Sequence, residues 1–177
     1  MVQEMASAIK GIYRDRLYGA DGRLRRDSGW RSNTILNGCR FLLAGFMMNE
    51  TATGIASLAV GEGDPSWDTD GVPAVSPATT TGLVKRYNPP LPTAELALVY
   101  LDTGDQVVAG PSSRVQMTAT LVPGYPAPIA PATHFPLREF GLFGRLNGEE
   151  VLINTIRHPV LHKDEASTLI RVVRLYF

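Results

Sequence analysis

The sequence predicts a mainly β protein, either a β-sandwich or a barrel-like domain, with one N-terminal helix and two long Pro-rich loops. Short apolar or alternating runs recur along the chain and are separated by turn signals such as Asp-Gly and Asn-Gly. Only one segment has apolar residues at helical spacing. The 177 residues include 17 Gly and 13 Pro, which indicates many turns. We expect one domain over residues 1–177.

Residues 1–33 are expected to form an N-terminal β-hairpin. Alternating side chains begin at Gly11, Ala20–Gly22 supplies a turn, and Leu24–Trp30 returns. Asp-Gly favours a tight hairpin turn because Gly tolerates a positive φ. Arginines around this hairpin alternate with aspartates, so we expect ion pairs or a subunit contact and no nucleic-acid patch. These arginines are Arg23, Arg25, Arg26 and Arg31.

Residues 34–48 are expected to form the helix, with Asn33 or Thr34 as its N-cap. Its apolar positions recur every three or four residues. They are Ile35, Leu36, Cys39, Phe41, Leu42, Leu43, Phe46 and Met47. Because this surface is too apolar for a solvated helix, we expect the helix to pack onto a sheet.

Residues 55–177 are expected to form the β-sandwich. Its strands are short apolar or alternating runs. They are Ile55–Val60, Leu96–Leu101, Gln106–Ala109, Arg114–Val122, Leu137–Phe143, Val151–Ile156 and Leu169–Phe177. Turns are expected at Asp102–Asp105 and Asn147–Gly148.

Two windows, residues 64–93 and 123–136, contain six and five of the prolines. Neither window shows periodicity, and proline cannot donate a hydrogen bond to a β-ladder. We therefore expect extended loops or arms. Long loops on a rigid β scaffold commonly carry binding residues, although a plain surface excursion explains the same pattern.

Charge and cysteine content exclude several classes of protein. Seventeen Lys and Arg balance seventeen Asp and Glu, so no net positive field attracts nucleic acid. Cys39 is the only cysteine, so the chain forms no intrachain disulfide and no Cys-based zinc site. The longest apolar run, Phe41–Met48, is too short for a membrane span, and no secretion signal precedes it. We expect a protein made in the cytoplasm with no membrane partner.

The candidate ligand sites are weak. Gly61–Pro65 follows a strand but lacks the lysine and helix start of a phosphate loop. Asp64, Asp68 and Asp70 do not have calcium-loop spacing, so we interpret them as solvated turn residues. Glu149 and Glu150 are adjacent on a strand and therefore point to opposite faces, which disfavours acid/base chemistry. We expect no cofactor.

His158 and His162 have the i, i+4 spacing of a metal pair on a helix, but Pro159 disfavours a helix there. We expect edge-of-strand or interface histidines and no metal, and a metal on a threefold axis is the alternative. No nucleophile motif is present, and Cys39 lies on the expected helix. We therefore expect a protein that is not an enzyme.

Several segments together resemble tail structural proteins of tailed bacteriophages, above all the attachment regions of tail or collar fibre and baseplate-associated proteins. The resemblance extends over most of the chain. Its segments are Gly11–Leu24, Ser28–Asn33, Leu58–Pro65, Thr79–Arg86, Leu137–Gly144 and Ile156–Phe177.

This resemblance implies a non-enzymatic, homo-oligomeric virion component, made in the host cytoplasm and assembled into the tail. It would join the tail or baseplate to fibres or neighbouring virion proteins, and the absence of a shaft after Phe177 favours an adaptor. No functional residue is transferred from the family. Aromatic residues dominate interface energetics, and the candidate interface residues are aromatic residues of the loops and the last strand. They are Trp67, Tyr125, Phe135, Tyr176 and Phe177.

Two other functions remain as alternatives. The first is a monomeric carbohydrate- or ligand-binding β-sandwich module, which would present aromatic residues on a sheet face. The second is a small hydrolase that uses His134 with Glu139 or Asp164. Self-association distinguishes the adaptor from the monomeric module.

Overall fold

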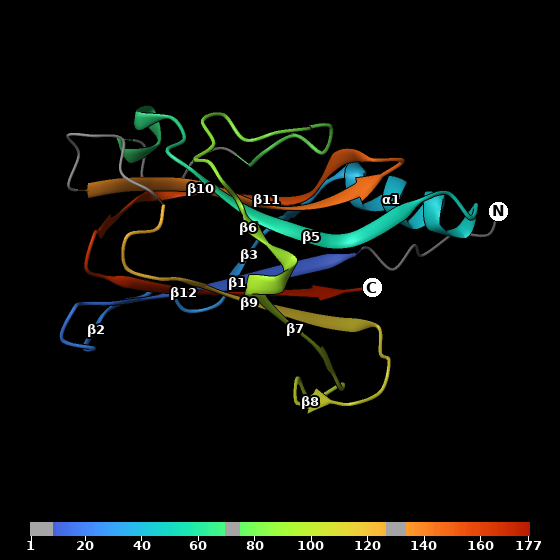
Figure 1. Cartoon of the computed structure of the whole chain (residues 1–177), viewed down its shortest axis with the longest axis horizontal. Helices are drawn as coiled ribbons and strands as arrows, with labels where there is room; N and C mark the ends of the chain where they lie inside the picture. Colours follow the sequence, from blue (N-terminus) through green and yellow to red (C-terminus); the bar gives the residue numbers. More distant parts are fainter. Residues whose placement is uncertain (1–8, 70–74, 127–133) are drawn as a thin grey trace.

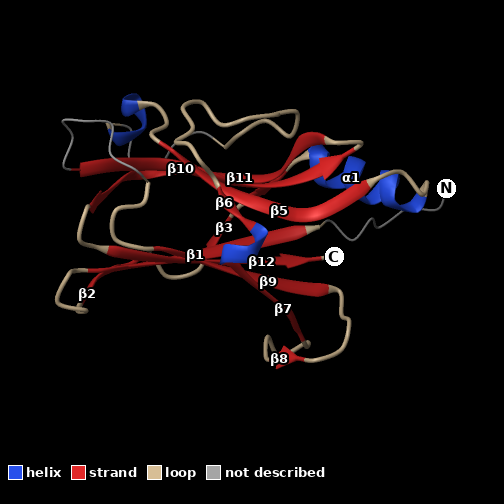
Figure 2. Cartoon of the chain, in the orientation of Figure 1, coloured by secondary structure: helices blue, strands red, loops and turns tan. Residues whose placement is uncertain are grey.

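The chain folds into two antiparallel β-sheets that lie as two layers (Figures 1 and 2). The computed structural model describes residues 9–69, 75–126 and 134–177. Within this part of the chain there is one α-helix, at one end of the two layers. The predicted mainly β class is confirmed.

The first sheet, sheet A, has seven strands in the order β2-β1-β12-β9-β7-β8, with β3 also paired to β1. The strands are β1 (Lys10–Tyr18), β2 (Leu24–Asp27), β3 (Arg31–Ser32), β7 (Leu96–Leu101), β8 (Val107–Val108), β9 (Arg114–Leu121) and β12 (Thr168–Tyr176). The first and last long strands are direct neighbours, because Lys10 pairs with Tyr176 and Tyr18 with Thr168.

The second sheet, sheet B, has five strands in the order β4-β11-β10-β5-β6. They are β4 (Thr34–Ile35), β5 (Ala52–Gly61), β6 (Leu91–Pro92), β10 (His134–Leu146) and β11 (Glu149–Asp164). The β10–β11 hairpin turns at Asn147 and Gly148, whose φ values are +52° and +88°. Both positive values fit the predicted Asn-Gly turn.

Alternating burial produces the core between the sheets. Along β12, every second side chain from Leu169 to Leu175 is buried. Leu169, Val173 and Leu175 belong to one apolar cluster with residues of β10 and β11, whereas Arg171 is the charged residue of this face. Tyr13 of β1 and Phe140 of β10 meet edge to face across the layers, with ring centroids 5.4 Å apart.

The predicted N-terminal hairpin is confirmed by the pairing of β1 with β2, whereas the predicted helix boundary is wrong. Thr34 and Ile35 form β4 and pair with β11, and helix α1 covers Asn37–Met47. The N-cap is Leu36, with no side-chain cap, so neither Asn33 nor Thr34 has the expected role. The chain passes from sheet A to sheet B between β3 and β4, and pairing with β11 keeps Thr34 and Ile35 in a strand instead of the helix.

Helix α1 packs on β11, β5 and β10 through a narrow face. Its buried residues are Cys39, Leu42 and Gly45, at the three-residue spacing of one helix face. The other apolar residues of the helix are exposed: Phe46 is 68% and Met47 is 80% accessible. The expectation that the helix packs onto a sheet is therefore confirmed, although the sheet covers only part of its apolar surface.

The two Pro-rich windows contain regular structure. Residues 64–93 include the 3₁₀ turn η1 (Pro65–Asp68), strand β6 and the start of η2 (Thr93–Glu95), and Arg86 bridges to Gly61. The window 123–136 ends inside β10, where Pro136 pairs with His162. The structure does not describe residues 70–74 and 127–133. In their described parts, both windows are mostly turns and loop, with short regular segments that pair with distant strands.

Candidate functional site

One end of the molecule exposes a contiguous apolar surface beside α1. Leu43, Phe46 and Met47 lie at i, i+3 and i+4 on the outer side of the helix and are exposed. Across from them, Leu98 and Tyr100 of β7 and the terminal Phe177 are also exposed. We call these six residues the apolar end.

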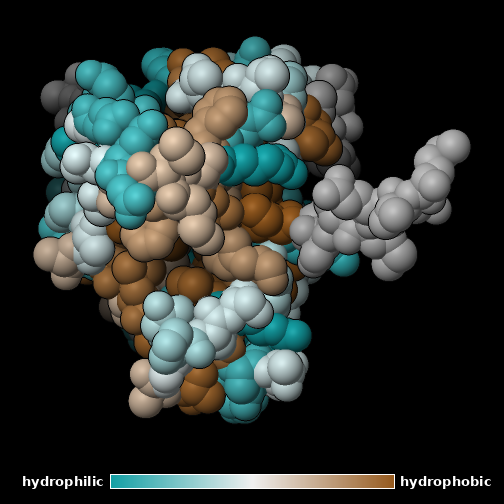
Figure 3. Space-filling model, turned by 90° about the vertical axis from the view of Figure 1, so that its right-hand side faces the viewer, coloured by the Kyte–Doolittle hydropathy of each residue, from teal (hydrophilic) through white to brown (hydrophobic). Residues whose placement is uncertain are grey.

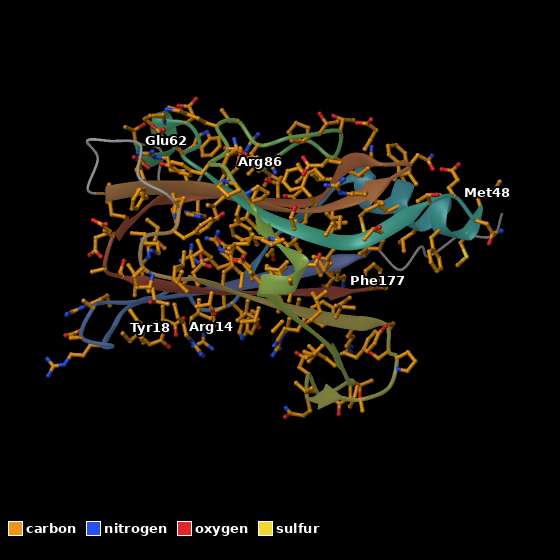
Figure 4. All side chains as sticks on the ribbon, in the orientation of Figure 1. Arg14, Tyr18, Met48, Glu62, Arg86 and Phe177 are labelled. Atoms are coloured by element: carbon orange, nitrogen blue, oxygen red, sulfur yellow. The ribbon has the colours of Figure 1, made fainter. Side chains whose placement is uncertain are left out.

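A groove of about 310 Å³ runs between the helix and β7. Leu43 forms its wall on the helix side, Leu98 and Tyr100 form the wall on β7, and Phe177 lies at its edge. Among the described residues, no Lys, Arg, Asp or Glu lines this groove. Figure 3 views this end of the molecule directly and shows hydrophobic residues exposed across its centre. In Figure 4, Met48 and Phe177 mark the same end, far from Tyr18.

The five predicted interface aromatics have different environments. Phe177 is 42% exposed and belongs to the apolar end. Tyr176 precedes it but points to the other face of β12, where Arg114 stacks on its ring. Phe135 is only 2% exposed and belongs to the core, so its expected exposure is wrong. It lies in β10, where the buried face of the strand takes its side chain inward.

Trp67 and Tyr125 are half-buried and contact their own chain. The guanidinium of Arg157 lies 5.0 Å from the Trp67 ring centroid. The Tyr125 hydroxyl donates a 2.9 Å hydrogen bond to the Pro89 carbonyl, and burial raises its pKa to about 12. These contacts give both aromatics a role in holding the Pro-rich segments, while their role as interface residues stays a prediction.

Two charged residues of β10 hold the first Pro-rich segment against sheet B. Arg138 forms a forked contact with Asp68 of η1, with its shortest distance at 2.7 Å. The buried carboxylate of Glu139 accepts hydrogen bonds from the backbone N–H groups of Val84 (3.0 Å) and Lys85 (2.7 Å). Glu139 is thus committed to backbone recognition, which weakens the hydrolase alternative. His134 lies in β10, and its side chain is outside the described residues.

A second notable cluster is a charged group inside the core. Arg171 of β12 is fully buried and donates hydrogen bonds of 2.7 and 2.6 Å to the two carboxylate oxygens of Asp15, directly opposite on β1. Its guanidinium also stacks on Phe140, 3.4 Å from the ring centroid. Because each charge is paired and hydrogen-bonded, the cluster is compatible with burial.

His158 completes this cluster from β11. Its Nδ1 lies 2.8 Å from the Pro159 carbonyl and therefore carries the proton, which leaves Nε2 to accept from Arg171 at 3.2 Å. Burial, together with the positive charge of Arg171, lowers the pKa of His158 to about 4. The expectation of an edge or interface histidine is wrong for His158, because its side chain lies in the core.

The structure does not bring His158 and His162 together. A β-bulge interrupts the register between them, so that His158 is buried while His162 is exposed. In the part of the chain that the structure describes, no three His, Cys, Asp or Glu residues form a group that could hold a metal. Asp64 accepts from the Ser66 backbone N–H and caps η1, as expected for a turn aspartate, and Asp70 lies outside the described residues.

Sequence reasoning missed the buried ion pair, although one signal was present. Arg171 interrupts the apolar alternation Leu169, Val173, Leu175 and lies on the same face of β12. A charged residue at such a position requires a partner, but the partner, Asp15, is 156 positions away and became visible only with the β1–β12 register.

Comparison with protein families, with curated proteins and with solved structures found no match to this chain. Among the described residues, no helix combines the length and apolar character that a membrane crossing requires.

Proposed function

We propose that this chain is a structural assembly protein that forms a homo-oligomer through its apolar end. The observation that carries the proposal is the exposure of Phe46 and Met47 beside an uncharged groove. A contiguous exposed apolar surface of this kind typically marks an interaction site. Burial against a partner removes it from water and supplies a favourable free energy.

A second copy of the chain is the partner that this surface fits best. The helix presents protruding side chains, Phe46 and Met47, next to a groove of about 310 Å³ on the same end. Each copy therefore carries both a ridge and a groove. Permanent homo-oligomeric interfaces are more apolar than transient ones, and the described residues that line the groove are all uncharged.

The resemblance to phage tail proteins supports a place for this oligomer in a phage or phage-like tail. In this proposal the chain is a non-enzymatic virion component that is made in the host cytoplasm and assembled into the tail. The oligomer joins the tail or baseplate to fibres or neighbouring virion proteins. Trp67 and Tyr125 of the Pro-rich segments do not line the groove at the apolar end, so in this proposal these segments contact the other partners.

The oligomer is tested by light scattering coupled to size-exclusion chromatography on the wild type and on Phe46→Glu. We expect an oligomer for the wild type and a folded monomer for the variant, because a buried unpaired carboxylate opposes association. The matched control is Leu24→Glu, which changes an exposed leucine of β2 at the opposite end. A monomeric wild type, or equal dissociation of both variants, contradicts the proposal and favours the monomeric ligand-binding module.

The place in the particle is tested by density-gradient fractionation of a particle-producing culture, followed by an immunoblot for this chain. We expect the chain in the fraction of large particles and in labelled tails by electron microscopy. If the chain stays with small proteins while particles form, the tail assignment is wrong, whatever the oligomeric state.

A further inference from the structure

The arginines near the first hairpin differ in their ionic partners. Four of them lie within ion-pair distance of Asp21 or Asp27, and these are Arg14, Arg16, Arg23 and Arg25. Arg26 and Arg31 have no such carboxylate among residues 9–69, 75–126 and 134–177. Within the described ranges, both side chains donate to backbone carbonyls alone, Arg26 to Val160 at 3.4 Å and Arg31 to Ser28 at 3.1 Å.

Both of these arginines line the same polar pocket of about 210 Å³ between β1, β2 and β11. Tyr13 forms part of its wall. The Tyr13 side chain is only 5% exposed, and its hydroxyl has no hydrogen-bond partner in the described part of the chain. The hydroxyl is not one of the enclosed polar atoms that lack a partner, so it is accessible from the pocket and free to donate to a ligand there.

The charges around the pocket favour a negative group. Asp15 also lines it, but both of its carboxylate oxygens accept hydrogen bonds from Arg171. The positive charges of Arg26 and Arg31 are therefore not compensated. Burial has the largest effect on the pKa of the neighbouring His158 and lowers it; the charges of Arg171 and Arg26 lower it further, whereas the charge of Asp15 raises it.

We propose that this pocket binds a single carboxylate group, held by the guanidinium groups of Arg26 and Arg31 and by the hydroxyl of Tyr13. A guanidinium presents several N–H donors in a plane and matches the two oxygens of a carboxylate. Phosphate, which carries more negative charge than a carboxylate, serves as a separate probe in the test. The carboxylate is either a free small acid or an acidic side chain of a partner protein.

This pocket is separate from the apolar end, so the proposal does not depend on homo-oligomer formation. The test is an NMR titration of the full ¹⁵N-labelled chain at constant ionic strength. The probes are sodium acetate, sodium phosphate and two blocked tripeptides, acetyl-Gly-Glu-Gly-amide and acetyl-Gly-Gln-Gly-amide. Variants are Arg26→Gln and Arg31→Gln, with Arg25→Gln as the matched control, because Arg25 lies on the same hairpin but pairs with Asp21.

We expect saturable shifts near Tyr13 with acetate or with the Glu tripeptide, and at least tenfold weaker binding in Arg26→Gln and Arg31→Gln. Arg25→Gln should bind as the wild type does. Tighter binding of the Glu tripeptide than of acetate identifies a partner side chain, and the reverse order identifies a free acid. Non-saturable shifts, equal binding of the Gln tripeptide, tighter phosphate binding or an equal loss in Arg25→Gln would overturn the proposal.

Discussion

The two ends of the strand pair β1–β12 reverse the usual distribution of residue types. Toward Tyr18 and Thr168, the pair buries the charged residues Asp15 and Arg171 in the core. Toward Lys10 and Tyr176, the neighbouring surface leaves apolar residues in solvent, among them Phe177. The buried charges are paired with each other within the chain, although Nη1 of Arg171 has no hydrogen-bond partner among the described residues. The exposed apolar groups have no covering partner among the described residues. The first end thus stabilises the fold, and the second is the surface that we propose for association.

Breaking the buried ion pair should have the largest effect on stability. Asp15→Ala leaves the fully buried guanidinium of Arg171 without its carboxylate, and such a change costs about 3–5 kcal/mol of unfolding free energy. Urea unfolding measures this loss. The double variant Asp15→Leu/Arg171→Met should recover most of it, because a buried pair replaced by apolar residues is often neutral.

The matched control for this prediction is Arg14→Ala, which breaks the exposed pair with Asp27 on the same strand. We expect a much smaller change, because solvent screens an exposed ion pair. If Asp15→Ala were no more destabilising than Arg14→Ala, the buried pair of Asp15 and Arg171 would not be important for stability.

His158, beside the buried pair of Asp15 and Arg171, should make the stability of the protein depend on pH. Its pKa falls from 6.5 in the unfolded chain to about 4 in the folded protein, because burial and Arg171 oppose the charged form. Between these values the unfolded chain binds more protons, so stability is lost as the pH falls from 6.5 to 4, by up to about 3 kcal/mol. His158→Gln should remove this part of the pH dependence.

Thermal unfolding at pH 7 and at pH 4.5 measures the effect. The control is His162→Gln, which changes an exposed histidine of the same strand and should keep the wild-type pH dependence. If the melting temperature of His158→Gln changed with pH as much as that of the wild type, the lowered pKa of His158 would not contribute to the pH dependence of stability.

The close fit of α1 decides whether the apolar end is a fixed surface. A Cβ on Gly38 would lie 2.2 Å from the backbone oxygen of Leu152, which cannot move without breaking the sheet. Gly38→Ala should therefore cost about 1–3 kcal/mol, although alanine normally favours a helix by about 1 kcal/mol. Chemical denaturation shows whether the free energy of unfolding falls, as the clash predicts, or rises, as helix propensity alone would predict.

Gly45→Ala is the comparison variant, because its nearest obstacle is the flexible end of the Leu146 side chain. We expect a smaller loss than for Gly38→Ala. A gain in stability for Gly38→Ala would mean that the helix is not held tightly on β11.

The smallest effect is expected at the apolar end itself. Met47→Ser removes a side chain that is 80% exposed, so the free energy of unfolding of the dilute monomer should change by less than about 0.5 kcal/mol. At high protein concentration, the wild type should melt at a higher temperature than when dilute, and the variant should lose this shift, because association stabilises the folded chain. A melting temperature independent of concentration in the wild type would contradict association through this surface.

Local sequence signals predicted much of the fold. The strand over Leu96–Leu101 has its predicted bounds, and Asn147–Gly148 forms the predicted turn. These features depend on side-chain alternation and on residues that tolerate a positive φ, both of which act between near neighbours. The start of α1 was misplaced because Thr34 and Ile35 pair with a strand more than a hundred residues away. Of the candidate interface residues, only Phe177 was placed at the apolar end.

The sequence by itself determined that this chain is a mainly β protein with one helix, because periodicity and turn chemistry are written locally. Only the tertiary structure decided which side chains are covered. It placed Asp15 opposite Arg171, turned Phe135 inward and left Phe46 in solvent. Burial depends on contacts between distant segments, and the free energy of a charge or an apolar group depends on what those contacts provide.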